Sequence, residues 1–332
     1  MNPYIGHSLQ LAGVEEFRLT GGLGDGMRML SVRNGKGLSC LISMDRCADL
    51  MRVEIDGVNM GYFAGCGHVH PAYYEKDGIS FLKSFTAGFM TTCGLAAVGS
   101  PCEDEGEVLG LHGTISNIPA ENHSWEETED EIIIKAQMRD ARLFARRLLL
   151  SRVYRISKIT NTISMEDTVT NIGSAESPVM LLYHCNMGYP LLSENAQVVV
   201  PANSVLPRAE YPADAIPNCL NMEKPQAGYE EQCFYHDVKE TNSIAKCGIY
   251  NPDIEKGMVM SFDKRTLDCF TEWKMMGAYD YVLGLEPGNC RPDGRDVMRK
   301  DGTLKFVAPG ENYKTSLSFD FKRDKASFDG AF

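Results

Sequence analysis

The sequence predicts an all-β protein built from short strands, because its hydrophobicity alternates, turn residues separate the alternating runs, and no βαβ rhythm is present. Between residues 313 and 322 apolar and polar side chains alternate strictly, which is the period of a half-buried antiparallel strand. Dipeptides such as Asn34-Gly35 and Asp301-Gly302 are turn signals between such runs. A succession of short strands with this punctuation favours a sandwich or a barrel.

Further strands are expected wherever an apolar or alternating run lies between turn residues. Residues 132–139 and 163–170 alternate in the same way as 313–322. Other extended segments are expected at 148–156, 179–183, 197–200, 258–262, 281–285 and 304–307. Residues 201–225 carry five prolines and little periodicity, so we expect an irregular loop at about 201–230. Such a loop either shapes a ligand site at the mouth of the sheet or serves as a packing lid.

Composition narrows the classes of partner. The chain has 332 residues, 43% of them hydrophobic and 23% charged, as in a globular protein with a large core. Its net charge of -12 argues against nucleic acid, which requires a basic surface, and favours a neutral or cationic small ligand. No segment approaches the about 20 consecutive apolar residues that cross a bilayer, so no membrane partner is expected. The eleven cysteines include no Cys-x-x-Cys pair, which favours the reduced thiols of a cytoplasmic protein.

Three short polar segments stand at the ends of apolar, extended runs. They are Leu111-His112-Gly113, Tyr183-His184-Cys185-Asn186-Met187-Gly188-Tyr189-Pro190 and Leu285-Glu286-Pro287-Gly288-Asn289. Each places one titratable group where a sheet could hold it rigidly with its tip in a cleft. Two histidines and one carboxylate are sufficient to move protons on and off a neutral substrate.

Two other segments have both a chemical and a structural interpretation. Arg46 and Asp49, in Asp45-Arg46-Cys47-Ala48-Asp49, could bind substrate hydroxyls or could belong to an internal network of ion pairs. His68 and His70 would project from one face of a strand and could bind a metal with His112 or His184. No carboxylate ligand lies close to them in sequence, so ordinary hydrogen-bonded histidines are favoured over a metal site.

Five motifs together resemble the galactose mutarotase-like superfamily of aldose 1-epimerases, and more closely its uncharacterised DUF4432 branch. They are Asp45-Arg46-x-x-Asp49, Thr92-Cys93-Gly94-Leu95, Leu111-His112-Gly113, the segment from Tyr183 to Leu192, and Glu286-Pro287-Gly288-Asn289. The resemblance extends from about residue 20 to residue 322. It implies a single galactose mutarotase-like domain over residues 1–332, folded as a β-supersandwich of large antiparallel sheets with few short helices.

The resemblance also implies a reaction and a set of site residues. His184 resembles the general acid of the superfamily, Glu286 the general base, and His112 the histidine that holds the substrate. The implied reaction interconverts the anomers of a sugar or sugar derivative by acid–base opening and closing of the ring, with no cofactor and no metal. The other expected substrate-binding residues are Arg46, Asp49, Tyr183, Asn186, Lys274 and Asn289, where Lys274 would serve an acidic or phosphorylated sugar.

This sequence departs from the ordinary mutarotase pattern beside these residues. Thr91-Thr92-Cys93-Gly94-Leu95 stands where an Asn-Arg pair usually holds the sugar hydroxyls, and Cys185-Asn186 follows the acid histidine in place of an aromatic residue. Two alternatives therefore stay open. One is a non-catalytic carbohydrate-binding protein on the same fold, and the other is a metal-dependent sugar isomerase using His68, His70 and His112. The sugar and the oligomeric state are left open.

Overall fold

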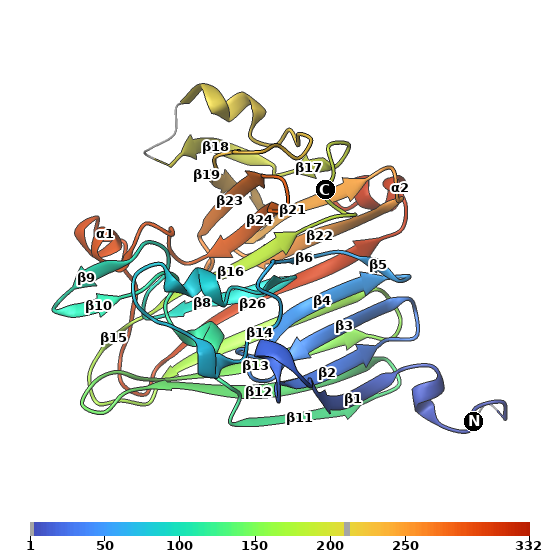
Figure 1. The fold of residues 1–332 in the computed structure, drawn as a ribbon, viewed down its shortest axis with the longest axis horizontal. Coiled ribbons are helices and arrows are strands. Elements are labelled where there is room, and N and C mark those ends of the chain that lie inside the picture. The colour runs from blue at the N-terminus through green and yellow to red at the C-terminus, as the bar shows by residue number, and fades with distance from the viewer. Residues whose placement is uncertain (1–2, 209–212) are drawn as a thin grey trace.

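Two large antiparallel sheets dominate the structure, a computed structural model that describes residues 3–208 and 213–332 (Figure 1). The first sheet runs in the order β11 (Asn122–Glu127), β12 (Glu131–Ala141), β13 (Arg147–Ser157), β14 (Thr162–Asn171), β26 (Asn312–Lys322), β22 (Lys256–Asp263), β21 (Ile244–Asn251) and β17 (Gln197–Val199), and β20 (Glu240–Thr241) also pairs with β21. The second runs in the order β18 (Ala202–Pro207), β19 (Gln232–Val238), β23 (Cys269–Met276), β24 (Tyr281–Gly288), β16 (Met180–Met187) and β8 (Met90–Leu95).

Smaller elements complete the fold. A five-stranded sheet contains β1 (Gly13–Arg18), β2 (Arg28–Arg33), β3 (Leu38–Ser43), β4 (Asp49–Ile55) and β5 (Val58–Asn59). Three strand pairs join β6 (Tyr62–Phe63) to β7 (Ala87–Gly88), β9 (Cys102–Asp104) to β10 (Glu107–Leu109), and β15 (Ser177–Pro178) to β25 (Phe306–Val307). The helices are short: η1 (Ser8–Gln10), η2 (Gly22–Gly24), η3 (Pro71–Tyr73), η4 (Ser80–Lys83), η5 (Ile115–Asn117), η6 (Ala213–Asn218), α1 (Arg295–Lys300) and α2 (Lys325–Asp329).

This architecture confirms the predicted all-β fold of large antiparallel sheets with few short helices. Most expected strands are present, and β12, β13, β14 and β26 are longer than the alternation alone indicated. The predicted extent of the strand at 304–307 was wrong, because only Phe306–Val307 forms a strand, which pairs with β15. The loop expected at about 201–230 begins with β18 and includes η6, so it is less irregular than predicted. Pro212, one of its five prolines, lies outside the described residues.

The two large sheets pack face to face, and β16 shows how the alternation of its side chains serves both faces. On one face the hydroxyl of Tyr183 lies 2.8 Å from Oδ2 of Asp167 on β14 and 2.6 Å from Oγ1 of Thr315 on β26. The buried side chains that the two sheets turn toward each other form one continuous core. Because neighbouring residues of a strand point to opposite faces, His184 projects away from this core.

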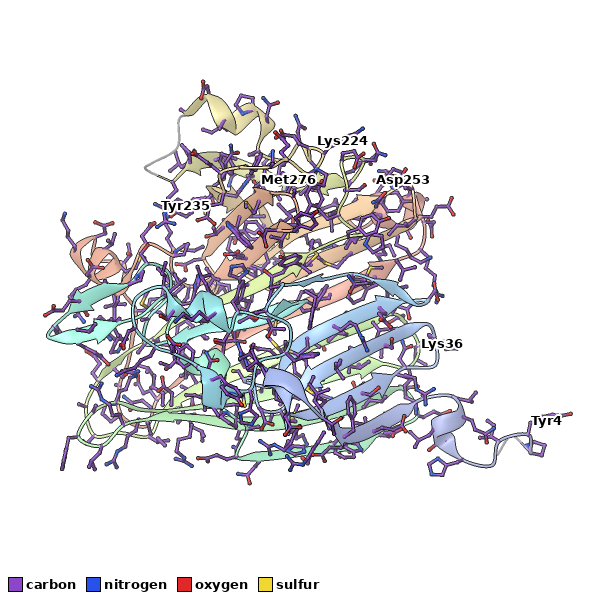
Figure 2. All side chains as sticks on the ribbon, viewed as in Figure 1. Tyr4, Lys36, Lys224, Tyr235, Asp253 and Met276 are labelled. Carbon is purple, nitrogen blue, oxygen red and sulfur yellow. The ribbon has the colours of Figure 1, made fainter. Side chains whose placement is uncertain are left out.

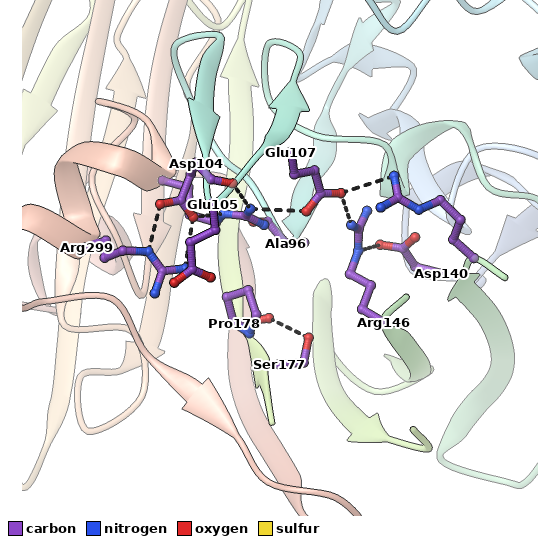
Figure 3. A network of polar contacts seen from close by, with 11 residues as sticks. Ala96, Asp104, Glu105, Glu107, Asp140, Arg146, Ser177, Pro178 and Arg299 are labelled. Carbon is purple, nitrogen blue, oxygen red and sulfur yellow. Dashed lines mark hydrogen bonds and ion pairs between the residues drawn. The ribbon is translucent and has the colours of Figure 1, made fainter. Parts of the chain in front are cut away.

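A network of ion pairs anchors α1 to the hairpin of β9 and β10 (Figure 3). Asp104 accepts hydrogen bonds from Nε of Arg295 at 2.6 Å and from Nε of Arg299 at 2.7 Å. Glu107 joins Arg295 to Arg146, which precedes β13. The network thereby holds α1 against the hairpin and the start of β13. No helix in the described ranges is long and apolar enough to span a membrane.

Candidate active site

A pocket of about 490 Å³ lies on the face of the second large sheet that points away from the core. Strands β16, β23 and β24 supply its polar floor, and the segments around η4 and residues 99–101 supply much of its apolar wall. The side chains that line the wall are Ile79, Phe81, Leu82, Phe85, Pro101, Leu111 and Pro292. The remaining lining residues with side chains are Ser100, His112, His184, Arg208, Glu231, Cys233, Thr271, Trp273 and Glu286. An apolar wall facing a few convergent polar groups is typical of a small-molecule site.

His184 and Glu286 stand opposite each other on adjacent strands at the floor of this pocket. The register pairs Leu182 with Gly288 and Cys185 with Leu285, and this places His184 across from Glu286. Nε2 of His184 lies 3.2 Å from Oε1 of Glu286. Both side chains are almost fully buried, with 6% and 2% of their surfaces exposed. The structure therefore brings the two predicted catalytic residues together.

Asn186 fixes the orientation of the His184 ring. Both residues lie on the same face of β16, because they are two positions apart on the strand. The Asn186 Nδ2 donates to the backbone oxygen of His184 at 2.8 Å, so its Oδ1, 2.6 Å from Nδ1 of His184, is the acceptor. Nδ1 therefore carries a hydrogen, and Nε2 is the nitrogen that exchanges a proton with Glu286 or with a ligand.

Burial shifts both members of the pair toward their neutral forms. Desolvation lowers the pKa of His184 to about 4, although its hydrogen bond with Asn186 acts in the opposite direction. Desolvation, with a smaller contribution from the charge of Glu231, raises the pKa of Glu286 well above its usual value. Burial therefore favours the form of the pair in which the carboxyl group holds the proton and Nε2 of His184 can accept a hydrogen bond.

His112 lies beside His184 on a turn that precedes η5. The centres of the two imidazole rings are 5.5 Å apart. The backbone of His112 has a φ of 58°, in the left-handed region that few residues other than glycine adopt, and this places its side chain at the pocket. Desolvation, together with His184 and Arg208, lowers the pKa of His112 to about 3. His112 is therefore a neutral hydrogen-bonding group.

Thr271, Arg208 and Glu231 line the pocket although they were not expected among its site residues, and Trp273, expected as a contact residue only for a carbohydrate-binding protein, lines it as well. Thr271 pairs with Glu286 across β23 and β24, and its buried hydroxyl has no hydrogen-bond partner among the described residues. The ring of Trp273 packs edge-on against the ring of His184, with their centres 5.2 Å apart, and Nε1 of Trp273 donates to Oε2 of Glu231 at 2.7 Å. The strand period could have indicated Trp273 and Thr271 together, since they are two positions apart, whereas no local pattern distinguishes Arg208 or Glu231.

Arg46 and Asp49, expected to bind substrate, do not line this pocket. Arg46 is buried and donates to the backbone oxygen of Val69 at 3.1 Å. Asp49 accepts hydrogen bonds from the backbone and the hydroxyl of Thr92, and it forms an ion pair of 2.7 Å with Arg152. The structure thus places Asp49 in an internal ion-pair network, the other interpretation of this segment.

Tyr183, Lys274 and Asn289 also lie outside the pocket. Tyr183 faces the core between the sheets, as described above. Nζ of Lys274 is held by the backbone oxygens of Asn218 and Asn221 at 3.3 and 2.6 Å, and by Glu223 at 3.1 Å. The amide of Asn289 bonds to the backbone of residues 179 and 181 and so ties the end of β24 to β16. The positive charge at the pocket is that of Arg208 instead.

His68, His70 and His112 do not converge as a ligand set. Within residues 3–208 and 213–332, the one group of three donors spaced for a metal is Cys219, His236 and Glu272, which does not include them. Nδ1 of His70 accepts from the backbone of Ala72 and caps η3. The ring of His68 packs edge-on against Phe63, with their centres 4.9 Å apart. These positions give no support to a metal-dependent site built on the three histidines.

Comparison with solved structures places the fold in the galactose mutarotase-like class. A Klebsiella pneumoniae protein provisionally described as an aldose 1-epimerase is 26% identical with a TM-score of 0.89, and the match covers 96% of this chain and 85% of that one. The galactose 1-epimerase of Lactobacillus acidophilus is 12% identical with a TM-score of 0.64, over 95% of this chain and 100% of that one. A galactose mutarotase-like protein of Clostridium acetobutylicum is 13% identical with a TM-score of 0.65, over 94% and 99%.

The particular family within this class follows from the sequence model that the chain matches. Residues 24–321 match DUF4432, described as a domain of unknown function, and the chain belongs to this family. No curated protein matches the chain significantly in sequence.

Proposed function

We propose that this protein is an isomerase that interconverts the anomers of a sugar or sugar derivative by general acid–base catalysis. The observation that carries the proposal is the buried pair of His184 and Glu286, whose Nε2 and Oε1 atoms lie 3.2 Å apart in a pocket of about 490 Å³. Opening a hemiacetal ring requires one group that removes a proton and one that delivers a proton. The aldose 1-epimerase fold of the solved relatives supports the same reaction class.

In the proposed mechanism Glu286 acts as the base and His184 as the acid. A sugar hydroxyl that donates to Glu286 stabilises the carboxylate, and the proton of the pair then resides on Nε2 of His184. Glu286 removes the proton of the anomeric hydroxyl, the carbonyl bond forms, the bond from C1 to the ring oxygen breaks, and His184 protonates that oxygen. Rotation about the C1–C2 bond presents the other face of the aldehyde, and the same steps run in reverse.

Burial of the pair favours the ring-opened stage of this cycle. After ring opening the carboxyl of Glu286 is protonated and His184 is neutral, which is the form that burial of the pair stabilises. The aldehyde therefore forms beside two uncharged groups. Each positioned acid or base contributes about 10²- to 10⁴-fold, which is sufficient for a reaction that also proceeds in water.

The remaining lining residues are proposed to hold the sugar. His112 and Thr271 offer hydrogen-bonding groups to hydroxyls, and Trp273 offers an aromatic face against which a sugar ring can stack. Arg208 lines the pocket and forms an ion pair of 3.4 Å with Asp293, so a carboxylate or phosphate on the sugar would share this guanidinium with Asp293. The proposed ligand is therefore a small carbohydrate, with no nucleic acid and no cofactor. The eleven free cysteines agree with the proposed cytoplasmic location.

NMR exchange spectroscopy over a panel of neutral, acidic and phosphorylated sugars tests the proposal. We expect the protein to accelerate α/β exchange of at least one sugar, and Glu286→Gln and His184→Gln each to lower kcat/KM by about 10²- to 10⁴-fold. Glu126→Gln makes the same chemical change at an exposed residue of β11 outside the pocket, and should retain full turnover. Exchange that stays at the uncatalysed rate for every sugar that binds would instead favour the non-catalytic carbohydrate-binding alternative.

A further inference from the structure

A second cluster of reactive side chains lies where a segment closes the space between the edges of the two large sheets. This closing segment, residues 213–226, contains η6 and continues toward β19. Its Asn221 forms an isolated bridge with Gln197 of β17, the edge strand of the first sheet. Its Gln226 donates to the backbone oxygen of Met276 on β23 at 2.9 Å, in the part of the molecule where Figure 2 labels Lys224 and Met276. The closing segment is therefore attached to both sheets.

Three donor atoms of different chemical types converge beneath the closing segment. They belong to Cys219 of that segment, His236 of β19 and Glu272 of β23, and all lie within 4.8 Å of one another. Because Thr271 and Trp273 line the sugar pocket, the alternation of β23 turns Glu272 to the opposite face of the sheet. The cluster is consequently separate from the proposed active site, and the acid–base mechanism does not use it.

The hydrogen bonds of these residues leave two buried polar atoms unsatisfied. The side chains of His236 and Glu272 have 0% of their surfaces exposed, and Nε2 of His236 lies 2.8 Å from Oε2 of Glu272. Oε1 of Glu272 and Nδ1 of His236 have no hydrogen-bond partner among the described residues. Buried polar atoms without partners are rare, because burial removes their hydrogen bonds to water without replacement. A bound cation would satisfy the carboxylate oxygens.

We propose that Cys219, His236 and Glu272 form a binding site for a divalent transition-metal ion of the Zn²⁺ type. A thiolate, an imidazole nitrogen and a carboxylate oxygen are the three ligand types that Zn²⁺ takes in proteins. The thiolate discriminates against Mg²⁺ and Ca²⁺, which prefer oxygen ligands. With three protein ligands, a fourth position remains for water or for the second oxygen of Glu272.

The spacing of the donors is close to that of a tetrahedral site. Metal–ligand bonds of about 2.0–2.3 Å place the ligand atoms of such a site about 3.3–3.8 Å apart. The contact between His236 and Glu272, at 2.8 Å, must open slightly, whereas 4.8 Å is the upper limit for every pair in the cluster. Cys219 lies outside the regular sheets, next to η6, so a small movement of its side chain can complete the coordination.

The charges around the cluster also fit a divalent cation. A thiolate and a carboxylate together carry two negative charges, so the loaded site is electrically neutral and can stay buried. Lys274, on the same face of β23 as Glu272, is already compensated by Glu223 and by two backbone oxygens of the closing segment. The bound ion would therefore fasten the closing segment to β19 and β23. Arg208 and Glu231, which line the sugar pocket, flank that segment in sequence.

Cobalt(II) substitution tests this site on the full chain. Protein that has been reduced, treated with chelator and desalted is titrated with Co²⁺, whose thiolate complexes have a charge-transfer absorption band. We expect one equivalent of Co²⁺ per chain, a thiolate band that Zn²⁺ abolishes by displacement, and a Tm that rises with either metal. Mg²⁺ should change neither the spectrum nor the Tm.

Variants identify the ligands. Cys219→Ser should remove the thiolate band and the Tm response, whereas Cys102→Ser, which replaces a thiol on β9, should retain both. If Cys219→Ser does not fold, His236→Gln and Glu272→Gln provide the same test through a weakened Co²⁺ affinity. The proposal would be overturned if the wild-type protein bound no more Co²⁺ than Cys219→Ser does. It would also be overturned if Cys219→Ser kept the thiolate band. A Tm unaffected by saturating Zn²⁺ would show a metal-free hydrogen-bonded cluster instead.

Discussion

Nδ1 of His184 and Oδ1 of Asn186 lie 2.6 Å apart, and this contact fixes which nitrogen of the imidazole faces the proposed base. Asn186 donates its own amide hydrogen to the backbone oxygen of His184, so its side chain cannot rotate to offer a donor to the ring without losing that bond. Nε2 is consequently held toward Glu286. In this arrangement Asn186 positions the acid and does not itself contact the reacting atoms.

Asn186→Ala should therefore lower the turnover number more than it weakens substrate binding. Without the Asn186 acceptor the imidazole can rotate or change tautomer, and misplacement of a reacting group by about 1 Å can cost about 10²-fold in rate. We expect a decrease of about that size in kcat with little change in KM, measured by NMR exchange at saturating sugar. Asn186→Asp, which keeps the acceptor for Nδ1–H, should retain more activity than Asn186→Ala. Equal turnover in both variants would contradict the positioning role.

The protonation state of His184 is a second prediction. Since burial lowers its pKa to about 4, the ring should be neutral at pH 6 in the ligand-free protein and carry its hydrogen on Nδ1. Nitrogen-15 chemical shifts of the imidazole ring report both properties directly. An imidazolium signal assigned to His184 at pH 6 would contradict this prediction.

The same pKa has a consequence for stability. In the unfolded chain a histidine has an ordinary pKa of about 6.5, so between pH 6.5 and about 4 the unfolded state binds more protons at this position. The contribution of His184 to stability is therefore fully present above pH 6.5 and is lost as the pH falls toward 4, at up to about 1.4 kcal/mol per pH unit. Urea denaturation of wild type and His184→Gln between pH 5 and 7 should show the wild type losing stability relative to the variant as the pH falls.

Gly284 provides a fourth prediction, because the carboxylate of Glu286 lies over it. A Cβ at this position would lie 2.3 Å from Oε1 of Glu286 and 3.0 Å from Cβ of Trp273. Gly284→Ala should therefore displace the Glu286 side chain and lower kcat/KM by about 10²-fold, with circular dichroism unchanged. Gly65→Ala, at a glycine with nothing within 4 Å of the added Cβ, should leave activity unchanged. Full activity of Gly284→Ala would argue against a fixed position for the carboxylate.

The sequence predicted those parts of the structure that depend on local periodicity. Alternation identifies strands because one face of each strand packs on the core, and this relation holds within a few residues. The same alternation places Asn186 on the same face of β16 as His184, because the two residues are two positions apart. The pairing of β16 with β24 joins segments far apart in the chain, such as Leu182 and Gly288, so no local pattern predicts that His184 meets Glu286; that expectation came from the family resemblance.

Contacts between distant segments explain the residues that the sequence placed incorrectly. From sequence alone Asp49 could be a ligand-binding carboxylate. In the structure it pairs with Arg152, which lies 103 residues further along the chain. Lys274 and Trp273 are neighbours, but only the packing of the sheets shows that Trp273 faces the pocket and Lys274 the closing segment. Arg208 precedes and Glu231 follows the closing segment in sequence, and no local periodic pattern predicts that both side chains line the pocket.

The last prediction concerns Arg152, which lies at the centre of the buried network that contains Asp49. Its guanidinium forms ion pairs of 2.7 Å with Asp49 and 2.6 Å with Asp167, and it is 0% exposed. Arg152→Met would leave two buried carboxylates without their cation, and breaking such a network costs about 3–5 kcal/mol. Arg155→Met, three residues further along β13, removes an ion pair with Glu131 whose arginine is 45% exposed, and should cost less than about 1 kcal/mol. Urea denaturation at pH 7 measures both free energies of unfolding, and equal values for the two variants would show that the network contributes no more than a surface ion pair.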